Sequence, residues 1–362
     1  MSNDPPAGPG DTVMKWVTRV SAVIALGFAI IQVVRTVSDV RDRHRQIDEL
    51  VRTAELQKHN LDYEHAWAGY AQAVTIAESG GVLAKLTGQL STEAGVLRVL
   101  QENLAMAWLD NIEIGPGQTF SEVVDKVAPV LTRGAAMAGG RRKADLVAHL
   151  GWASYLLTRE GRAGGDPALQ YRDALAADPQ NPYAHAYLGH WLEGTGRPVE
   201  EGRAEFAAAL ASGRATNYVR VLQLAAMRNR GSEGELDYVA IANDMRKNGE
   251  PFDATARTEL FDIYAPVCGY REDAAGLGRL LTAAPAAEQA ATVRALLVDR
   301  ADIPADQRPE HNACVAVLLE AAGDRAQALD VWRTVRQQVP AHDPNGLAER
   351  AEQAIRRLGT KS

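Results

Sequence analysis

The chain has 362 residues, of which 46% are hydrophobic and 23% charged, so it can build a folded core and is not disordered as a whole. Its formal net charge is −7 and no basic stripe interleaves with aromatic residues, which argues against binding to nucleic acid. Alanine is abundant and almost no stretch alternates in the manner of a β-strand, so an all-α fold is expected.

The first 37 residues divide into two segments. Residues 1–12 are rich in proline and glycine and predict a disordered tail. Residues 13–37 contain the uncharged run Val20–Val34, which as a helix rises roughly 22 Å against a hydrocarbon layer of about 30 Å. The long basic side chains on either side can reach the interface, so a transmembrane helix at 13–37 is predicted. A cleaved signal peptide and a buried core helix are the alternatives.

Basic residues flank this segment unequally. Lys15 and Arg19 precede the run, whereas its other side carries Arg35, Arg41, Arg43 and Arg45. The positive-inside rule then places the carboxyl side in the cytoplasm. The expected localisation is therefore the inner or plasma membrane, as a single-pass protein whose main domain faces the cytoplasm.

The helix is expected to run on through residues 38–60 into the first repeat. Its hydrophobic positions recur with a period near 3.5, which is the seam of a coiled coil. The seam consists of Val33, Val37, Val40, His44, Ile47, Val51 and Ala54. It predicts a homodimer through residues 33–54; the alternative is one amphipathic helix that packs on the first repeat.

A common pattern recurs in four segments of the chain. In each, one face of the predicted helix carries an aromatic residue next to small residues. The segments are residues 61–77, 167–179, 199–213 and 323–340. The shared positions are Ala66, Tyr70 and Ala73; Tyr171 and Ala174; Gly202, Phe206 and Ala209; and Ala328, Trp332 and Val335. Tyr171 and Phe206 are 35 residues apart, so the segments form a structural repeat. Asp62 and Asp324 are the expected caps of the first and last of these helices.

Two further segments, "LVAHLGWASYLL" and "AHAYLGHWLEG", carry a Leu–Gly pair at Leu150–Gly151 and Leu188–Gly189. With the second-helix pattern, they make the chain resemble the tetratricopeptide repeat (TPR) family, whose signature is W-x2-L-G-x2-Y, then A-x3-F and a proline. The resemblance implies an all-α, TPR-like α-solenoid of antiparallel helix pairs, preceded here by the transmembrane helix. The glycine lets the second helix approach closely, and the aromatic residue fills the space beside it.

The resemblance covers residues 50–77, 144–181, 182–216 and 309–340 of a repeat domain that spans residues 50–342. Residues 82–140 predict two helices longer than a standard repeat. Residues 217–250 and 252–285 can each be interpreted as a helix pair of about the right length without the full signature, and the sequence leaves open whether residues 217–304 stack regularly. Residues 343–362 predict a polar capping helix and tail, which an open-ended solenoid needs for solubility.

The stretch "NPYAHAYLGHWLEG" places His185, His190 and Glu193 on one helix. The two histidines lie about 140° apart around the helix axis and cannot share a metal. The repeat register instead predicts a groove that binds a peptide, formed by Trp152, Tyr155, Tyr183, His190 and Glu193. The alternative is that these side chains pack helix against helix.

Cys268 and Cys314 stand alone, without C-x-x-C spacing. Buried thiols are the more common outcome for such residues, and a disulfide between them stays open. Neither is a good nucleophile, and the sequence predicts no catalytic, cofactor-binding or metal-ligating residue.

These observations predict a membrane-anchored TPR-like scaffold or adaptor that binds a protein or peptide in the groove of its solenoid, with no catalysis and no cofactor. The alternatives are an extracytoplasmic chaperone-like or assembly-factor module, and a non-catalytic regulatory subunit of an enzyme complex.

Overall fold

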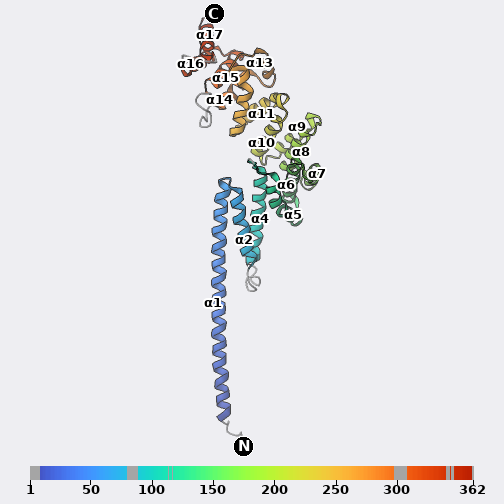
Figure 1. Cartoon of the computed structure of the whole chain (residues 1–362), viewed down its shortest axis with the longest axis vertical. Helices are drawn as coiled ribbons and strands as arrows, with labels where there is room; N and C mark the ends of the chain where they lie inside the picture. Colours follow the sequence, from blue (N-terminus) through green and yellow to red (C-terminus); the bar gives the residue numbers. More distant parts are fainter. Residues whose placement is uncertain are drawn as a thin grey trace. The chain divides into compact units, whose positions relative to one another are not determined.

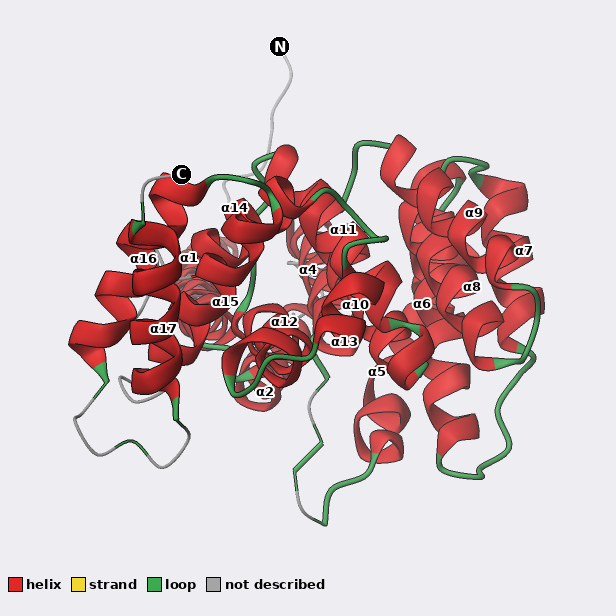
Figure 2. Cartoon of the chain, turned by 90° about the horizontal axis from the view of Figure 1, so that it is seen from above, coloured by secondary structure: helices red, strands yellow, loops and turns green. Residues whose placement is uncertain are grey.

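The computed structural model describes residues 9–79, 89–112, 114–115, 117–296, 308–339, 343 and 346–360. Every regular element in these ranges is a helix, and none is a strand, as Figure 2 shows. The predicted all-α fold is therefore confirmed, and consecutive helices pack against one another in a way compatible with an α-solenoid. The chain forms two compact units, Met1–Gln170 and Tyr171–Ser362.

In its described residues, the first unit contains five helices, each of which packs on the next one described along the chain (Figure 1). They are α1 (Pro9–His59), α2 (Tyr63–Glu78), α4 (Gln89–Asp110), α5 (Phe120–Met137) and α6 (Gly140–Arg159), and α7 (Pro167–Ala177) runs from this unit into the second. Helices α4 and α5 are the two long helices predicted within residues 82–140, of which 82–88 lie outside the described residues.

The predicted transmembrane helix at 13–37 is wrong. These residues belong to the continuous helix α1, which Figure 1 shows running well past α2. Within the described residues, no helix is both long enough and apolar enough to cross a membrane. The uncharged run Val20–Val34 spans only about 22 Å, and any longer window brings in Arg19 or Arg35. The predicted single-pass membrane localisation, with residues 13–37 in the membrane, is therefore wrong as well.

The carboxyl-terminal half of the predicted seam packs inside the chain. Ile47 is 2% exposed, in a cluster with Ala73 and Ala77 of α2 and Ala94 and Leu97 of α4. His44 lies 2.9 Å from the Glu93 carboxylate of α4, and Ala54 is fully buried against Gly69 of α2. This part of the helix therefore packs on the helices that follow it in the same chain, as the alternative of one amphipathic helix predicts. Homodimerisation through residues 33–54 stays a prediction for the other half, where Val37 is exposed.

The repeated small–aromatic–small face is buried in every segment that carries it. The buried residues are Ala66, Tyr70 and Ala73 of α2; Tyr171 and Ala174 of α7; Gly202, Phe206 and Ala209 of α9; and Ala328, Trp332 and Val335 of α16. Both predicted caps are confirmed, because the Asp62 and Asp324 carboxylates accept from backbone N–H groups three residues later. The pattern thus locates the core faces of these helices.

The second unit continues with α8 (Pro182–Gly194), α9 (Val199–Ala211), α10 (Thr216–Arg228), α11 (Glu235–Lys247), α12 (Ala254–Tyr264), a π-helical turn (Ala265–Gly269), α13 (Ala274–Leu280), α14 (Ala286–Leu296), α15 (Arg308–Ala321), α16 (Arg325–Gln338) and α17 (Leu347–Gly359). Helices α8 and α9 form a close pair, as do α15 and α16. At Gly189, a Cβ atom would meet the Phe206 ring and the Gly202 carbonyl at 3.1 Å, so glycine is what permits this approach.

In the described part of residues 217–304, whose regularity the sequence leaves open, the π-helical turn separates α12 from the short helix α13. Residues 297–307 lie outside the described residues. Helix α17 packs on α16 and buries Leu347, Ala351 and Ala354 against Trp332. The interpretation of Cys268 and Cys314 as free thiols is wrong: both are fully buried, but they are joined in a disulfide.

Candidate protein-binding face

His185, one of the two histidines that suggest a metal site, joins α8 to α9. Its Nδ1 lies 2.6 Å from a Glu205 carboxylate oxygen, and its Nε2 lies 3.0 Å from the Pro179 carbonyl oxygen. Burial lowers the pKa of His185, but these two acceptors outweigh it, so the pKa is raised overall. In the part of the chain that the structure describes, no three His, Cys, Asp or Glu side chains are grouped to hold a metal ion.

Trp152 and Tyr155, the predicted groove residues of the first unit, stack on each other along α6. Their ring centroids are 5.0 Å apart and their planes differ by 25°. Trp152 is 8% exposed, and its Nε1 donates to the Leu109 carbonyl of α4 at 3.2 Å. Tyr155 is half-buried, and burial raises the pKa of its hydroxyl. The tryptophan is thus committed to helix packing, while the tyrosine keeps an accessible edge.

In the second unit, His190 and Glu193 of α8 face inward. His190 is 6% exposed and the Glu193 side chain 2%. The Glu193 carboxylate fills the space left by Gly202 of α9, where a Cβ would lie 2.6 Å from it, and Arg230 Nε is 3.6 Å away. Burial raises the pKa of Glu193 despite the nearby Arg230 and Arg203. Neither side chain can reach a ligand in this conformation.

Tyr183 is the most accessible of the predicted residues in this unit, and it lies in a cluster of tyrosines. Its ring centroid is 5.9 Å from Tyr218 of α10 and 6.4 Å from Tyr187, one turn along α8. The Tyr218 hydroxyl donates to the Tyr187 hydroxyl at 3.2 Å, and the fully buried Tyr187 stacks in turn near Tyr171 of α7. The half-buried rings of Tyr183 and Tyr218 therefore pack on Tyr187, which restricts their positions.

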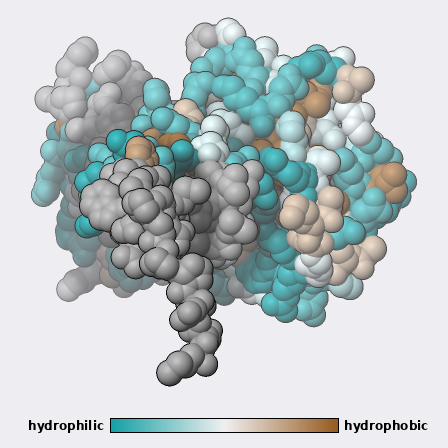
Figure 3. Space-filling view, turned by 90° about the horizontal axis from the view of Figure 1, so that it is seen from below, coloured by the Kyte–Doolittle hydropathy of each residue, from teal (hydrophilic) through white to brown (hydrophobic). Residues whose placement is uncertain are grey.

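Tyr218 was not among the predicted residues, although a signal for it exists. It follows Tyr183 by 35 residues, the same separation that relates Tyr171 to Phe206. Val221 lies one turn after Tyr218 on α10 and is 45% exposed. We call Tyr183, Tyr218 and Val221, with Tyr187 beneath them, the tyrosine face. Where Figure 3 colours the surface, hydrophobic residues form small separate patches in a largely hydrophilic surface.

Sequence comparison adds no relative to this description. No protein-family model matches the chain, and no curated protein matches it significantly.

Proposed function

We propose that this chain is a non-catalytic, TPR-like scaffold or adaptor that binds a segment of another protein on the tyrosine face of its second unit. The observation that supports the proposal is the pair Tyr183 of α8 and Tyr218 of α10. Both side chains are half-buried and lie against the buried Tyr187, and in a TPR-like arrangement α8 and α10 would be the first helices of successive repeats. In TPR-like solenoids the first helices line the inner groove, where a helix or an extended peptide binds.

Tyrosine is well suited to such a role. Its ring offers a large contact area with only two rotatable bonds, and its hydroxyl supplies a hydrogen bond at the edge of the contact. Tyr183 and Tyr218 already have ring neighbours, so little side-chain freedom is lost when a partner binds. The exposed Val221 extends the face with an apolar surface that a partner can cover.

Three titratable side chains that are largely buried support binding rather than catalysis, because each of them lies between two helices. His149 of α6 contacts Asp110 of α4, His185 contacts Glu205 of α9, and Glu193 lies against Gly202 of α9. A catalytic acid or base needs an open approach for a substrate, which these contacts occupy.

The proposal is tested with Val221→Arg in the full chain, because Val221 is exposed and the change should not unfold the domain. Met137→Arg, at another exposed apolar position, is the matched control. Each variant is purified from its native cells, and co-purifying proteins are quantified by mass spectrometry. We expect Val221→Arg to lose at least one partner that Met137→Arg retains. Identical partners for both variants, with wild-type circular dichroism, would contradict the proposal.

The disulfide favours the second candidate, an extracytoplasmic assembly factor that uses the same face. Disulfides persist in oxidising compartments and are rare in the cytosol. Cys268 and Cys314 are joined in a buried disulfide, so the folded state observed here is one that an oxidising compartment maintains. The two candidates differ in where the partner is found, and the partner identified above distinguishes them.

A further inference from the structure

The disulfide lies where the π-helical turn that follows α12 packs on α15, within the second unit. Cys268 belongs to the π-helical turn after α12, and Cys314 belongs to α15, 46 residues later. Gly269 shows how closely the turn lies on α15, because a Cβ there would be 3.3 Å from the Glu310 carbonyl and 3.4 Å from Cys314 Sγ. The disulfide therefore fastens the turn to α15 at their point of closest approach.

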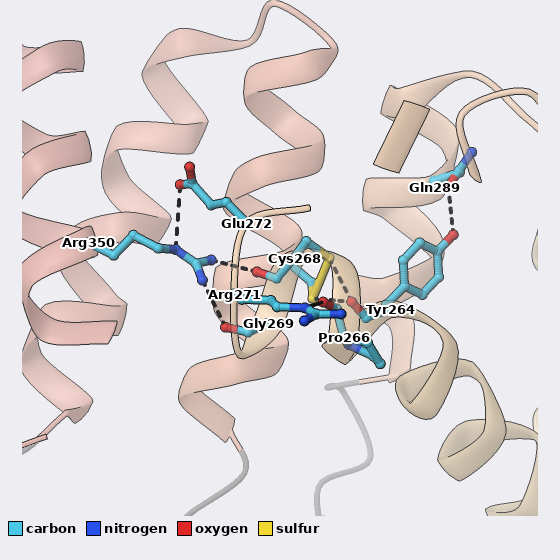
Figure 4. Close-up of a disulfide and its surroundings, with 9 residues drawn as sticks. Tyr264, Pro266, Cys268, Gly269, Arg271, Glu272, Gln289 and Arg350 are labelled. Carbon is cyan, nitrogen blue, oxygen red and sulfur yellow. Dashed lines mark hydrogen bonds and ion pairs between the residues drawn. A yellow bond between two sulfur atoms is a disulfide. The ribbon is translucent and has the colours of Figure 1, made fainter. Parts of the chain in front are cut away.

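The turn is also held from its other side. The Tyr264 hydroxyl donates to Gln289 of α14 at 2.8 Å, as Figure 4 shows, and the Gln289 amide donates to the Leu280 and Ala284 carbonyls. Arg271, two residues after the turn, donates from its Nε to the Pro266 carbonyl at 3.1 Å. These contacts hold the turn, and backbone hydrogen bonds from the Tyr270 and Asp273 N–H groups to the Ala265 and Val267 carbonyls close its end. The disulfide is the covalent link between that end and α15.

A side chain from the last helix uses the two carbonyls at this end. Arg350 of α17 donates to the Cys268 carbonyl at 2.6 Å and to the Gly269 carbonyl at 3.1 Å, and its Nε lies 3.6 Å from Glu272 (Figure 4). Its guanidinium also lies 5.3 Å from the centre of the Trp332 ring. A planar fork of donors needs both acceptors in a fixed arrangement, so the geometry of the turn sets the position of Arg350.

We propose that the Cys268–Cys314 disulfide is a redox-controlled lock that holds α17 on the second unit through Arg350. While the bond is intact, the turn presents both carbonyls to Arg350 and α17 stays docked. When the bond is reduced, the end of the turn separates from α15, Arg350 loses its paired acceptors and α17 loosens. The apolar surface that α17 covers, which includes Ala316, Trp332 and Val335, then becomes exposed.

The chemistry is thiol–disulfide exchange with a dithiol. One thiolate of the dithiol attacks a sulfur of the disulfide, and the other sulfur leaves as a thiolate and takes a proton. The second thiolate of the dithiol then displaces the chain's remaining sulfur, so Cys268 and Cys314 end as thiols and the dithiol ends as a disulfide. Because both sulfurs are buried, the exchange requires local opening of the turn. The lock therefore responds to sustained reducing conditions rather than to brief ones.

The test is hydrogen–deuterium exchange of the full chain, before and after reduction with dithiothreitol, with thiols counted by alkylation and mass spectrometry. We expect residues 347–359 to exchange about tenfold faster or more once two thiols are present, while α2 in the other unit is unchanged. Unchanged exchange of α17 after complete reduction would overturn the lock.

A second variant separates the role of Arg350 from the general stability that a disulfide provides. Arg350→Met keeps the disulfide but removes both donors, and we expect it to speed exchange of α17 without any reductant. Arg356→Met, at an exposed position of the same helix, is the matched control and should exchange like the wild type. If Arg350→Met leaves the exchange of α17 unchanged, the arginine does not transmit the state of the disulfide and the proposal fails.

Discussion

Two helix pairs of the second unit, α8–α9 and α15–α16, each bury an aromatic ring of the second helix, and they differ in a polar contact near the end of the first helix. Each first helix has a glutamate as its penultimate residue, Glu193 or Glu320. In α16 the aromatic residue is Trp332, whose Nε1 donates to Glu320 at 2.6 Å. In α9 it is Phe206, whose ring has no N–H or O–H, and neither Glu193 oxygen accepts a hydrogen bond from the residues that the structure describes.

The comparison separates two requirements of a helical repeat. The apolar pattern is enough to bury an aromatic ring between two helices, whether or not the nearby carboxylate finds a donor. Hydrogen bonding of the carboxylate depends on which aromatic residue is present, and a buried polar group without such a bond destabilises the folded state by about 1–3 kcal/mol. The pair α8–α9 is therefore expected to be the less stable of the two.

The largest effect is expected when α15–α16 is made to resemble α8–α9. Trp332→Phe removes the donor to Glu320 and leaves unfilled volume, so the free energy of unfolding should fall by about 2–3 kcal/mol. Chemical denaturation of the full chain measures it. Glu320→Gln combined with Trp332→Phe should cost less than the sum of the two single changes. Strict additivity would show that the hydrogen bond contributes nothing.

The converse change is expected to stabilise the pair α8–α9. Glu193→Gln removes a buried charge that accepts no hydrogen bond and whose desolvation outweighs the attraction of Arg230, so the protein should gain about 1 kcal/mol near neutral pH. Burial raises the pKa of Glu193 above its ordinary value of 4.5, so the penalty is absent below that value and grows as the pH rises through the folded pKa. Unfolding at low and neutral pH should show the gain only at the higher pH. Glu201→Gln, at a more exposed position of α9, is the control and should give no gain.

A smaller loss is expected in the first unit, where Tyr70 of α2 occupies the aromatic position and its hydroxyl donates to Glu55 of α1. Tyr70→Phe leaves the ring and removes only the donor, so it should cost about 0.5–1.5 kcal/mol. A double-mutant cycle with Glu55→Gln measures the coupling. No coupling between the two positions would show that the hydroxyl acts only through packing.

The smallest effect, limited to part of the pH range, also lowers the stability as the pH rises, but here a stabilising charge is lost, whereas at Glu193 a destabilising charge is gained. Fully buried His149 lies between two acceptors, the Asp145 carbonyl at 2.6 Å and the Asp110 carboxylate at 3.1 Å, which only the protonated ring can satisfy together. Burial lowers the pKa of His149, but Asp110 outweighs it and the pKa is raised above 6.5. The stabilisation is complete below that value and is lost as the pH rises through the folded pKa. Unfolding between pH values on either side should show this loss, and Asp110→Asn should abolish it.

The sequence predicts the core faces well and the polar environment poorly, for a physical reason. Burial of Tyr70, Phe206 and Trp332 follows from helical spacing, which is a local property. The inward position of Glu193 depends on Gly202 of a different helix, and the contact of Tyr218 with Tyr187 depends on how successive pairs stack. The spacing of residues along one helix does not determine such contacts between helices.

The two incorrect predictions have similar origins. The apolar run in α1 suggests a membrane helix if the flanking basic residues are counted as part of the span, but the run itself is too short. Cys268 and Cys314 carry no spacing motif, because they pair across 46 residues through the packing of a turn on α15. The regularity of the repeat gives no information about either feature.

The measurement that tests the proposed function most directly is site-specific photo-crosslinking in native cells, with a benzophenone amino acid in place of Val221. The tyrosines themselves stay intact in this variant. Partner binding on the tyrosine face predicts a discrete covalent adduct with one protein, absent when the label replaces Arg333, which is exposed on α16. Equal adducts at both positions, or none at Val221 in folded protein, would contradict the account.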